Sequence, residues 1–264
     1  MMTSSPSITT PDLTIVRQLE ALGFRAWPAS QVQYSGSWAI RLTPDHQSKR
    51  LNSVNPLDPG DFHNLDERVT AIKTMFEQAG KRPVFRLSPL AAPQLIQYLD
   101  DLGWVEKGRT ITMVRSIEPD FASKPTDIML SDDIEAYAKA SLAAHGKSLA
   151  EQNALSPALT AILSQIRPAK TMMIAKESDQ TVAAGLCVKD YAWAGLFDLA
   201  TAPSHQRQGL AAALIATSLQ WAQQRGAKRA WLQIEEGNLA GLALYRKLGF
   251  SESYRYCYRE MPQG

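Results

Sequence analysis

The sequence repeats itself, and this repeat constrains the fold more than any other feature. Shifting the chain by 146 residues, the distance from Gly103 to Gly249, aligns segment 102–104 (Leu-Gly-Trp) with segment 248–250 (Leu-Gly-Phe). The same shift, without a gap, aligns 78–85 with 224–231. Both of these longer segments combine a helix end, a glycine stop, a basic turn and an apolar strand. Two matches in one register predict two copies of one α/β unit.

A polar, proline-containing segment separates the two copies. Residues 116–126 include Pro119, Ser123 and Pro125, a composition typical of a linker. A length of 264 residues also favours two domains, since domains usually span about 100–200 residues. We therefore predict a first domain over residues 12–115, a linker over 116–126 and a second domain over 127–264.

The hydrophobic periodicity predicts an α/β (α+β) arrangement in each copy. In the second half, strands are expected at 171–176, 181–189, 193–201, 229–235 and 252–260, and helices at 132–144, 157–166, 209–225 and 238–248. The first three of these strands should form an antiparallel meander. In the first half, the same pattern predicts helices at 65–76 and 93–102 and strands at 83–87 and 110–115.

A polar turn at residues 201–211 joins an apolar strand to a long amphipathic helix. The first turn of a helix has unpaired N–H groups and a partial positive charge, so it suits a bound phosphate. Gly209 would allow close approach of the ligand, Ala211 would leave the next turn unobstructed, and Arg207 would add a cation. Taken alone, the pattern of Gln206, Gly209 and Ala211 also fits an ordinary strand-to-helix turn.

A second informative segment begins at Asn238. Asn238 and Tyr245 lie seven residues apart, so they share one helix face two turns apart, with Leu242 between them. An amide and a phenol can thus point into one cleft. The alternative is that Asn238 only caps the helix and Tyr245 is a half-buried aromatic residue of the core.

Together these segments closely resemble the GCN5-related N-acetyltransferase (GNAT) superfamily over residues 127–264. Its motif [QR]-x-x-G-x-[GA] is matched by Gln206, Gly209 and Ala211. Its motif N-x-x-[AG]-x-x-L-Y-x-K-x-G-F is matched by Asn238, Gly241, Leu244, Tyr245, Lys247, Gly249 and Phe250. The first half resembles a degenerate copy. The resemblance implies a tandem arrangement of two mixed, mostly antiparallel sheets flanked by helices, with splayed central strands in the C-terminal unit.

The resemblance also implies a cofactor, acetyl-CoA, and direct transfer of its acetyl group to an amine in a ternary complex. The backbone at 199–201 would pair with the pantetheine arm, and amides from Arg207 to Ala211 would hold the pyrophosphate. Tyr245 would protonate the departing thiolate. The implied cofactor-binding residues are Leu199, Ala200, Thr201, Gln206, Arg207, Gln208, Gly209, Leu210, Ala211, Asn238, Leu242 and Tyr245.

The sequence differs from the family pattern at the position expected to hold the general base. In similar peptide N-terminal acetyltransferases, a Glu precedes the motif Asn by five residues, whereas this chain has Gln233, which cannot accept a proton. Glu235 and Glu236 are candidate bases acting through water, or solvated loop charges. Asp198 has the opposite strand parity to Leu199, so we expect it to face away and to cap nearby backbone. An acceptor that arrives neutral needs no strong base.

The first copy lacks the corresponding residues. The 146-residue shift places Gly60, His63 and Leu65 opposite the three phosphate-loop residues, and Ala92 and Leu99 opposite Asn238 and Tyr245. We therefore predict that the first half does not bind CoA and that it walls the acceptor pocket. Its polar segment 49–55 is either a substrate-recognition element or a surface loop.

Composition argues against several other classes of protein. The net charge of +2 argues against a nucleic-acid-binding surface. No run of apolar residues is long enough to span a membrane, residues 1–10 do not resemble a secretory signal, and two cysteines do not make a disulfide framework. The histidines, His46, His63, His145 and His205, lack metal-site spacing, so we expect surface positions and no metal; only His205 lies near the phosphate loop.

We therefore predict a cytoplasmic N-acetyltransferase acting on a small-molecule amine or a peptide or protein amine, without nucleic-acid or membrane partners. The sequence leaves the acceptor and the oligomeric state open. The alternative is a CoA-binding sensor or interaction module with weak or no catalysis, because Gln233 cannot act as a base.

Overall fold

A computed structural model describes residues 11–118 and 128–262, so most of the predicted linker lies outside the described residues. The helices are α1 (Leu13–Ala26), α2 (Leu65–Gln78), α3 (Pro93–Asp101), α4 (Ile134–Ala144), α5 (Leu149–Gln165), α6 (Leu210–Gln223) and α7 (Leu239–Lys247), with a short 3-10 helix η1 (Pro203–His205). The strands are β1 (Gln31–Ser35), β2 (Trp38–Leu42), β3 (Ser53–Pro56), β4 (Val84–Leu87), β5 (Val105–Ser116), β6 (Ile128–Ser131), β7 (Ala169–Glu177), β8 (Gln180–Asp190), β9 (Trp193–Thr201), β10 (Arg229–Glu235) and β11 (Ser251–Glu260).

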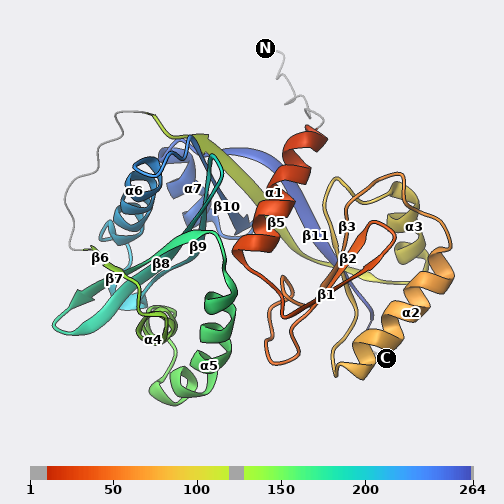
Figure 1. The fold of residues 1–264 in the computed structure, drawn as a ribbon, viewed down its shortest axis with the longest axis horizontal. Coiled ribbons are helices and arrows are strands. Elements are labelled where there is room, and N and C mark those ends of the chain that lie inside the picture. Colours follow the sequence, from red (N-terminus) through yellow and green to blue (C-terminus); the bar gives the residue numbers. More distant parts are fainter. Residues whose placement is uncertain (1–10, 119–127, 263–264) are drawn as a thin grey trace, which may run out of the picture.

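The described strands form one continuous 11-stranded sheet in the order β1-β2-β3-β4-β11-β5-β10-β9-β8-β7-β6. The predicted mixed α/β sheet flanked by helices is confirmed, but the expected separate sheets are joined (Figure 1). The junction exchanges the last strand of each half. Strand β5 of the first half pairs with β10, from Arg229↔Ser116 to Glu235↔Thr110, while β11 pairs with β4 and β5.

Most predicted elements of the second half are found within a few residues of their expected bounds. The exception is α5, which begins at Leu149 and not at Pro157. A capping box of Ser148 and Glu151 starts this helix, and Pro157 lies inside it. Our interpretation of Pro157 as a helix start was therefore wrong. Helix α1 and strands β1, β2, β3 and β6 were not predicted.

The two central strands of the second half diverge, as predicted. Strands β9 and β10 are parallel, and their register runs from Trp193↔Arg229 only to Leu196↔Leu232. Beyond that pair, β9 continues to Thr201 and β10 to Glu235 without pairing to each other. One edge of β9 therefore lacks a strand partner within the described part of the chain, while its other edge stays paired with β8.

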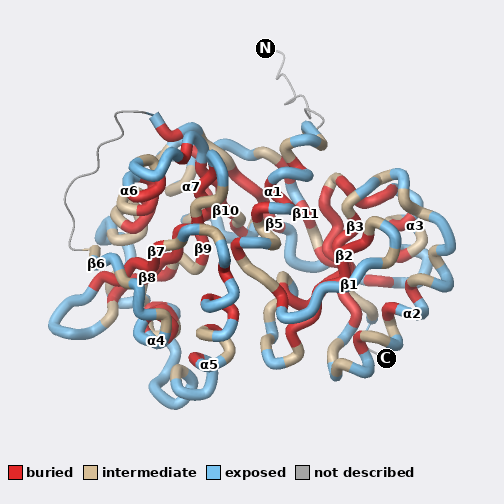
Figure 2. The backbone as a smooth tube through the Cα atoms, in the orientation of Figure 1, coloured by how far each residue is buried: buried red, intermediate tan, exposed pale blue. Residues whose placement is uncertain are grey.

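The hydrophobic core is continuous across the two halves. One cluster joins Val16 and Leu19 of α1 to Tyr137 of α4 and Phe197 of β9. The Trp27 ring, just after α1, stacks on Phe197 with ring centroids 6.2 Å apart. Figure 2 shows buried segments along the sheet in both halves. The first half is thus fixed against the place where β9 and β10 diverge. No helix in the described residues is long and apolar enough to cross a bilayer.

Candidate active site

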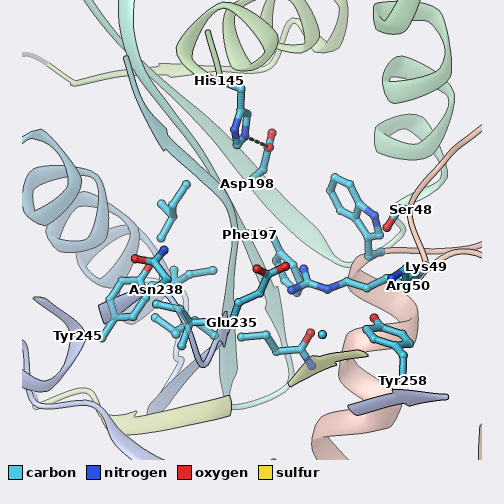
Figure 3. A pocket seen from close by; sticks show the side chains of 17 residues that line it. Ser48, Lys49, Arg50, His145, Phe197, Asp198, Glu235, Asn238, Tyr245 and Tyr258 are labelled. Atoms are coloured by element: carbon cyan, nitrogen blue, oxygen red, sulfur yellow. Dashed lines mark hydrogen bonds and ion pairs between the residues drawn. The ribbon is translucent and has the colours of Figure 1, made fainter. Parts of the chain in front are cut away.

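A cavity of about 590 Å³ lies where β9 and β10 diverge, and residues from both halves line it. The second half contributes His145, Leu196, Phe197, Asp198, Leu199, Leu232, Gln233, Ile234, Glu235, Asn238, Tyr245 and Tyr258. The first half contributes Trp27, Ser48, Lys49, Arg50 and Gly108. In Figure 3, Tyr245 and Asn238 lie on one side, Lys49, Arg50 and Tyr258 on the opposite side, and Glu235 between them.

The predicted phosphate loop forms the start of α6. Gly209 is its N-cap and has a left-handed backbone with φ of 89°, which disfavours other residues. A Cβ at this position would meet no heavy atom within 4 Å, so the space in front of the backbone is open. The first turn of α6 has neither an acidic residue nor a side-chain cap. Its N–H groups and partial positive charge suit an anionic group.

The neighbouring residues of this turn differ in their surroundings. Arg207 also has a left-handed backbone, with φ of 62°. The His205 ring lies 2.8 Å from the Glu177 carboxylate on β7, and His205 does not line the cavity. Leu199 lines the cavity, whereas Ala200 and Thr201 pair with Ala184 and Ala183 of β8.

Helix α7 presents two of the predicted side chains to the cavity. The Asn238 side chain accepts a hydrogen bond from the Gly241 N–H at 2.9 Å, so Asn238 does cap the helix, but it also lines the cavity. Gly241 lets α7 pack closely on β10, because a Cβ there would lie 2.5 Å from Ile234 Cδ1. Leu242 is buried in the core and is not a cavity-lining residue.

Tyr245 is half-buried against Phe250, with ring centroids 6.1 Å apart, and it lines the cavity. Burial raises the pKa of its phenol above the ordinary value of 10. The hydroxyl therefore carries its proton at neutral pH, as a proton donor requires.

Asp198 corrects our parity argument. A bulge between the pairs Ala184↔Ala200 and Leu186↔Phe197 places Asp198 at φ of 53° and breaks the strict alternation of β9. Asp198 therefore lines the cavity and does not cap nearby backbone. Its carboxylate contacts three side chains of α4 and its C-terminus: Tyr137 Oη at 3.0 Å, Ser141 Oγ at 2.5 Å and His145 Nε2 at 2.9 Å.

His145 is exposed, as the sequence predicts, and it also lines the cavity. The hydrogen bond with Asp198 raises the pKa of His145 above its ordinary value of 6.5. A His–carboxylate pair at a cavity can move a proton. Sequence reasoning missed the pair because its members lie on α4 and on the bulge of β9, and only the fold brings them together.

The candidate bases on β10 have different environments. Glu235 is exposed and lines the cavity, and its carboxylate has no ion-pair partner among the described residues. Glu236 forms an ion pair with Arg255 and does not line the cavity. Gln233 lines the cavity, and its Oε1 accepts a hydrogen bond from the Tyr256 hydroxyl at 3.3 Å.

The polar segment predicted at 49–55 is not a single loop, because Ser53, Val54 and Asn55 belong to β3, and the residues before them are held by specific contacts. The Asn52 side chain accepts from the Thr43 N–H at 2.8 Å and donates to the His46 carbonyl at 2.8 Å. Leu51 is fully buried in a cluster with Ile162 of α5. We refer to residues 43–52 as the cavity loop, because its residues 48–50 line the cavity.

Comparisons with known proteins agree with this geometry. A family described as "Probable histone acetyltransferase Rv0428c C-terminal" matches residues 14–259. "Uncharacterized N-acetyltransferase YobR" of Bacillus subtilis is 25% identical over 92% of this chain and 98% of that protein. "[Ribosomal protein bS18]-alanine N-acetyltransferase" of Escherichia coli is 42% identical over 60 residues, 23% of this chain and 40% of that protein. A solved structure described as a tandem GNAT protein from the clavulanic acid biosynthesis pathway has a TM-score of 0.63 at 13% identity, covering 93% of this chain and 88% of that one.

The family match over residues 14–259 shows that this chain is a member of the GNAT N-acetyltransferase superfamily, and the divergent strands, the glycine-led helix start and the Asn238–Tyr245 helix agree with it. Within that superfamily, the chain belongs to the family described as probable histone acetyltransferase Rv0428c, C-terminal. The predicted superfamily is thereby confirmed, and the family implies the use of acetyl-CoA.

Proposed function

We propose that this chain is an acetyl-CoA-dependent N-acetyltransferase whose second half holds the cofactor and whose acceptor enters between the two halves. The observation that supports this most is that Leu199, on the unpaired edge of β9, and Tyr245 of α7 line one cavity where β9 and β10 diverge. The uncapped start of α6 follows β9 in the chain.

The residues present fit acetyl-CoA. The first turn of α6, from Arg207 to Ala211, would hold the pyrophosphate with backbone N–H groups. The edge of β9 around Leu199–Thr201 carries backbone groups that can pair with the amides of the pantetheine arm. Acetyl-CoA supplies the acetyl group in activated form, as a thioester. Holding it beside the amine would contribute much of the rate enhancement.

The proton transfers would fall to three groups on the cavity. Tyr245 holds a proton at neutral pH and would give it to the leaving sulfur. Glu235 is an unpaired carboxylate and would accept the amine proton through water. The His145–Asp198 pair offers a second route for that proton, because it lies on the same cavity. Glu236 is a less suitable base, since it forms an ion pair with Arg255 and does not line the cavity.

The test is turnover of acetyl-CoA against amine panels. Free thiol release and acetylated product would be followed for amino acids, polyamines, aminoglycosides and short peptides with a free N-terminus, including an alanine-first peptide like the substrate named for the bS18 relative. We expect at least one class to be acetylated. CoA binding without turnover of any class would favour the alternative, a CoA-binding sensor, which Gln233 at the expected base position supports.

A further inference from the structure

Three arginines and one glutamate lie together between the two halves, beside the cavity. Arg41 of β2, Arg86 of β4 and Glu20 of α1 are all at least 95% buried. A smaller cavity lined by these three residues and Arg50 shares Trp27, Arg50, Phe197 and Gln233 with the main cavity. We call Arg41, Arg50 and Arg86 the guanidinium cluster. It is continuous with the acceptor end of the site.

This cluster carries more positive than negative charge. Glu20 balances Arg86, through Nη2 to Oε1 at 3.0 Å and a second short contact, and it also accepts from the Tyr254 hydroxyl at 2.6 Å. No carboxylate within the described ranges forms an ion pair with Arg41. Arg41 donates to the carbonyls of Arg50, at 2.7 Å, and Trp27, and its Nε has no partner. Burial, followed by repulsion from Arg86, lowers the pKa of Arg41 to about 10.

Arg50 is the member of the cluster that reaches the main cavity. The cavity loop fixes its backbone, and Figure 3 shows its side chain extending toward the centre of the site. No carboxylate of the described residues forms an ion pair with Arg50, whereas its neighbour Lys49 pairs with Glu260. Its side chain hydrogen-bonds the Tyr256 phenol, which donates in turn to Gln233.

One carboxylate faces three guanidiniums, two of which, Arg41 and Arg86, are buried, and this leaves an excess of positive charge. Such an excess is costly unless a negative group compensates it. Glu235 lies on the same cavity without an ion-pair partner, and it can attract an amine. The cavity thus presents opposite charges at two places, which complements a molecule carrying both an amine and an anion.

We propose that Arg50, supported by Arg41 and Arg86, binds an anionic group of the acceptor, so that the substrate is a small amine bearing a carboxylate or a phosphate. This inference rests on the proposed function and names its substrate class. Arg is well suited to this task, because its planar guanidinium binds either group through two parallel hydrogen bonds.

The same proposal gives Gln233 a role. A glutamate at this position would place a carboxylate beside the Tyr256 phenol and the guanidinium cluster, and it would supply the missing negative charge internally. The neutral amide leaves that charge to be supplied by the acceptor. Gln233→Glu should therefore weaken the binding of an anionic acceptor even if the new carboxylate can act as a base.

The experiment compares acceptors that differ only in the anion. L-amino acids are paired with their L-amino acid amides, and phosphoethanolamine is paired with ethanolamine, which separates carboxylate from phosphate recognition. We expect kcat/KM to be about 10–100-fold higher for the anionic member of at least one pair, as a hydrogen-bonded charge contributes about that much. Arg50→Gln should remove this preference by lowering kcat/KM for the anionic member of the pair, and Arg50→Lys should retain part of the preference.

Matched controls keep the result interpretable. Arg82→Gln removes an exposed arginine of the same half and should change nothing. Far-UV circular dichroism checks the fold of each variant, and Arg50→Lys and Gln233→Glu give independent readings if Arg50→Gln does not fold. Binding without turnover, measured as the shift in Tm on adding each acceptor in the presence of CoA, should show the same Arg50-dependent preference.

The outcomes separate the two proposals. Equal acetylation of charged and neutral partners, or a preference that survives Arg50→Gln, overturns the anion site and leaves the acetyltransferase proposal intact. If no acceptor is acetylated, the proposed function is overturned, and the anion site is then tested by the Tm shifts alone. Equal Tm shifts for charged and neutral molecules would overturn the anion site.

Discussion

The helix starts of α2 and α6 occupy corresponding places in the two halves, and they differ in charge. Both begin at a left-handed residue, Asn64 with φ of 52° in α2 and Gly209 with φ of 89° in α6. The first turn of α2 carries Asp66 and Glu67, whereas that of α6 carries no acid and follows Arg207. Acidic side chains complement the partial positive charge of a helix start. Helix α2 therefore carries its own compensating charge in its first turn, whereas α6 does not.

Asp61, just before α2 in the chain, adds a further carboxylate that pairs with Arg68 of that helix. It accepts hydrogen bonds from Ser37 and Arg68, and although burial opposes its ionisation, these bonds lower the pKa of Asp61 to about 2. A Cβ on Gly36 would lie 2.6 Å from its carboxylate, so Asp61 is packed against the turn between β1 and β2. The two helix starts thus share a left-handed first residue but differ in charge. The first half contributes Arg50 to the cavity and strand β5 to the joined sheet.

The largest effect should come from separating the halves. Without β5, residues 128–264 would expose the β10 edge that now pairs with residues 110–116. We expect each fragment, 1–117 or 128–264, to be insoluble or unfolded alone, and the two to form a folded 1:1 complex when coexpressed. Solubility and circular dichroism test this. A soluble, cooperatively unfolding 128–264 fragment would show that the exchanged strand is dispensable.

Gly209→Glu tests the difference in charge between the starts of α2 and α6. The substitution places a side chain and a negative charge in front of α6, similar to the acidic first turn of α2. We expect acetyl-CoA affinity to fall at least about 100-fold, because placing like charges together costs several kcal/mol. Calorimetry measures the affinity. Gly226→Glu is a matched control, since Gly226 also has a left-handed backbone, φ of 87°, and open space around it. Unchanged affinity in a folded Gly209→Glu variant would disprove the phosphate loop.

Tyr245→Phe tests the proposed general acid. The first half has Leu99 at the corresponding position, which cannot donate a proton. The ring can still pack on Phe250, so folding and acetyl-CoA affinity should change little. We expect kcat to fall by about 100-fold with little change in KM, the lower end for general acid catalysis, because a thiolate leaves readily. Steady-state kinetics checks this, with Tyr191→Phe at an exposed tyrosine as the control. A raised KM with normal kcat would make Tyr245 a binding residue.

The smallest effect concerns the His145–Asp198 pair, which has no counterpart identified in the first half. The folded-state pKa of His145 is raised by Asp198, so its stabilising contribution is complete below about pH 6.5 and is lost as pH rises through the raised value. We expect His145→Gln to lower the free energy of unfolding by about 1 kcal/mol or less at acidic pH, since the ring is half-exposed. Urea denaturation across pH, with His63→Gln as control, measures it. A loss that grows with rising pH would contradict the pair.

Much of the second half could be predicted from the sequence, because the signals that mark the ends and faces of its helices lie within single elements. The glycine at 209, the apolar spacing of α6 and the Asn238–Tyr245 spacing depend on neighbours within one element. The splay of β9 and β10 followed from the family resemblance. The same local signals placed Tyr245 and Glu235, both of which line the cavity.

The features that were missed depend on pairing between distant segments. Alternation of polar and apolar residues indicates which face of a strand is buried, but it does not indicate which strand lies beside it. The exchange of β5 and β11 between the halves could therefore not be predicted from the sequence. The bulge at Asp198 reverses strand parity by one extra residue, and no local signal marks it. Arg50 reaches the site through the cavity loop, which is held by Leu51 packing with Ile162 of the other half and by the side-chain hydrogen bonds of Asn52.

The most direct test of this account is the number of CoA molecules bound per chain. Calorimetry or native mass spectrometry of the full chain with acetyl-CoA should give one, because Gly209, Asn238 and Tyr245 correspond to His63, Ala92 and Leu99 in the first half. Gly209→Glu should reduce that number to zero. A stoichiometry of two, or one CoA that persists in the folded Gly209→Glu variant, would contradict the division of roles between the halves.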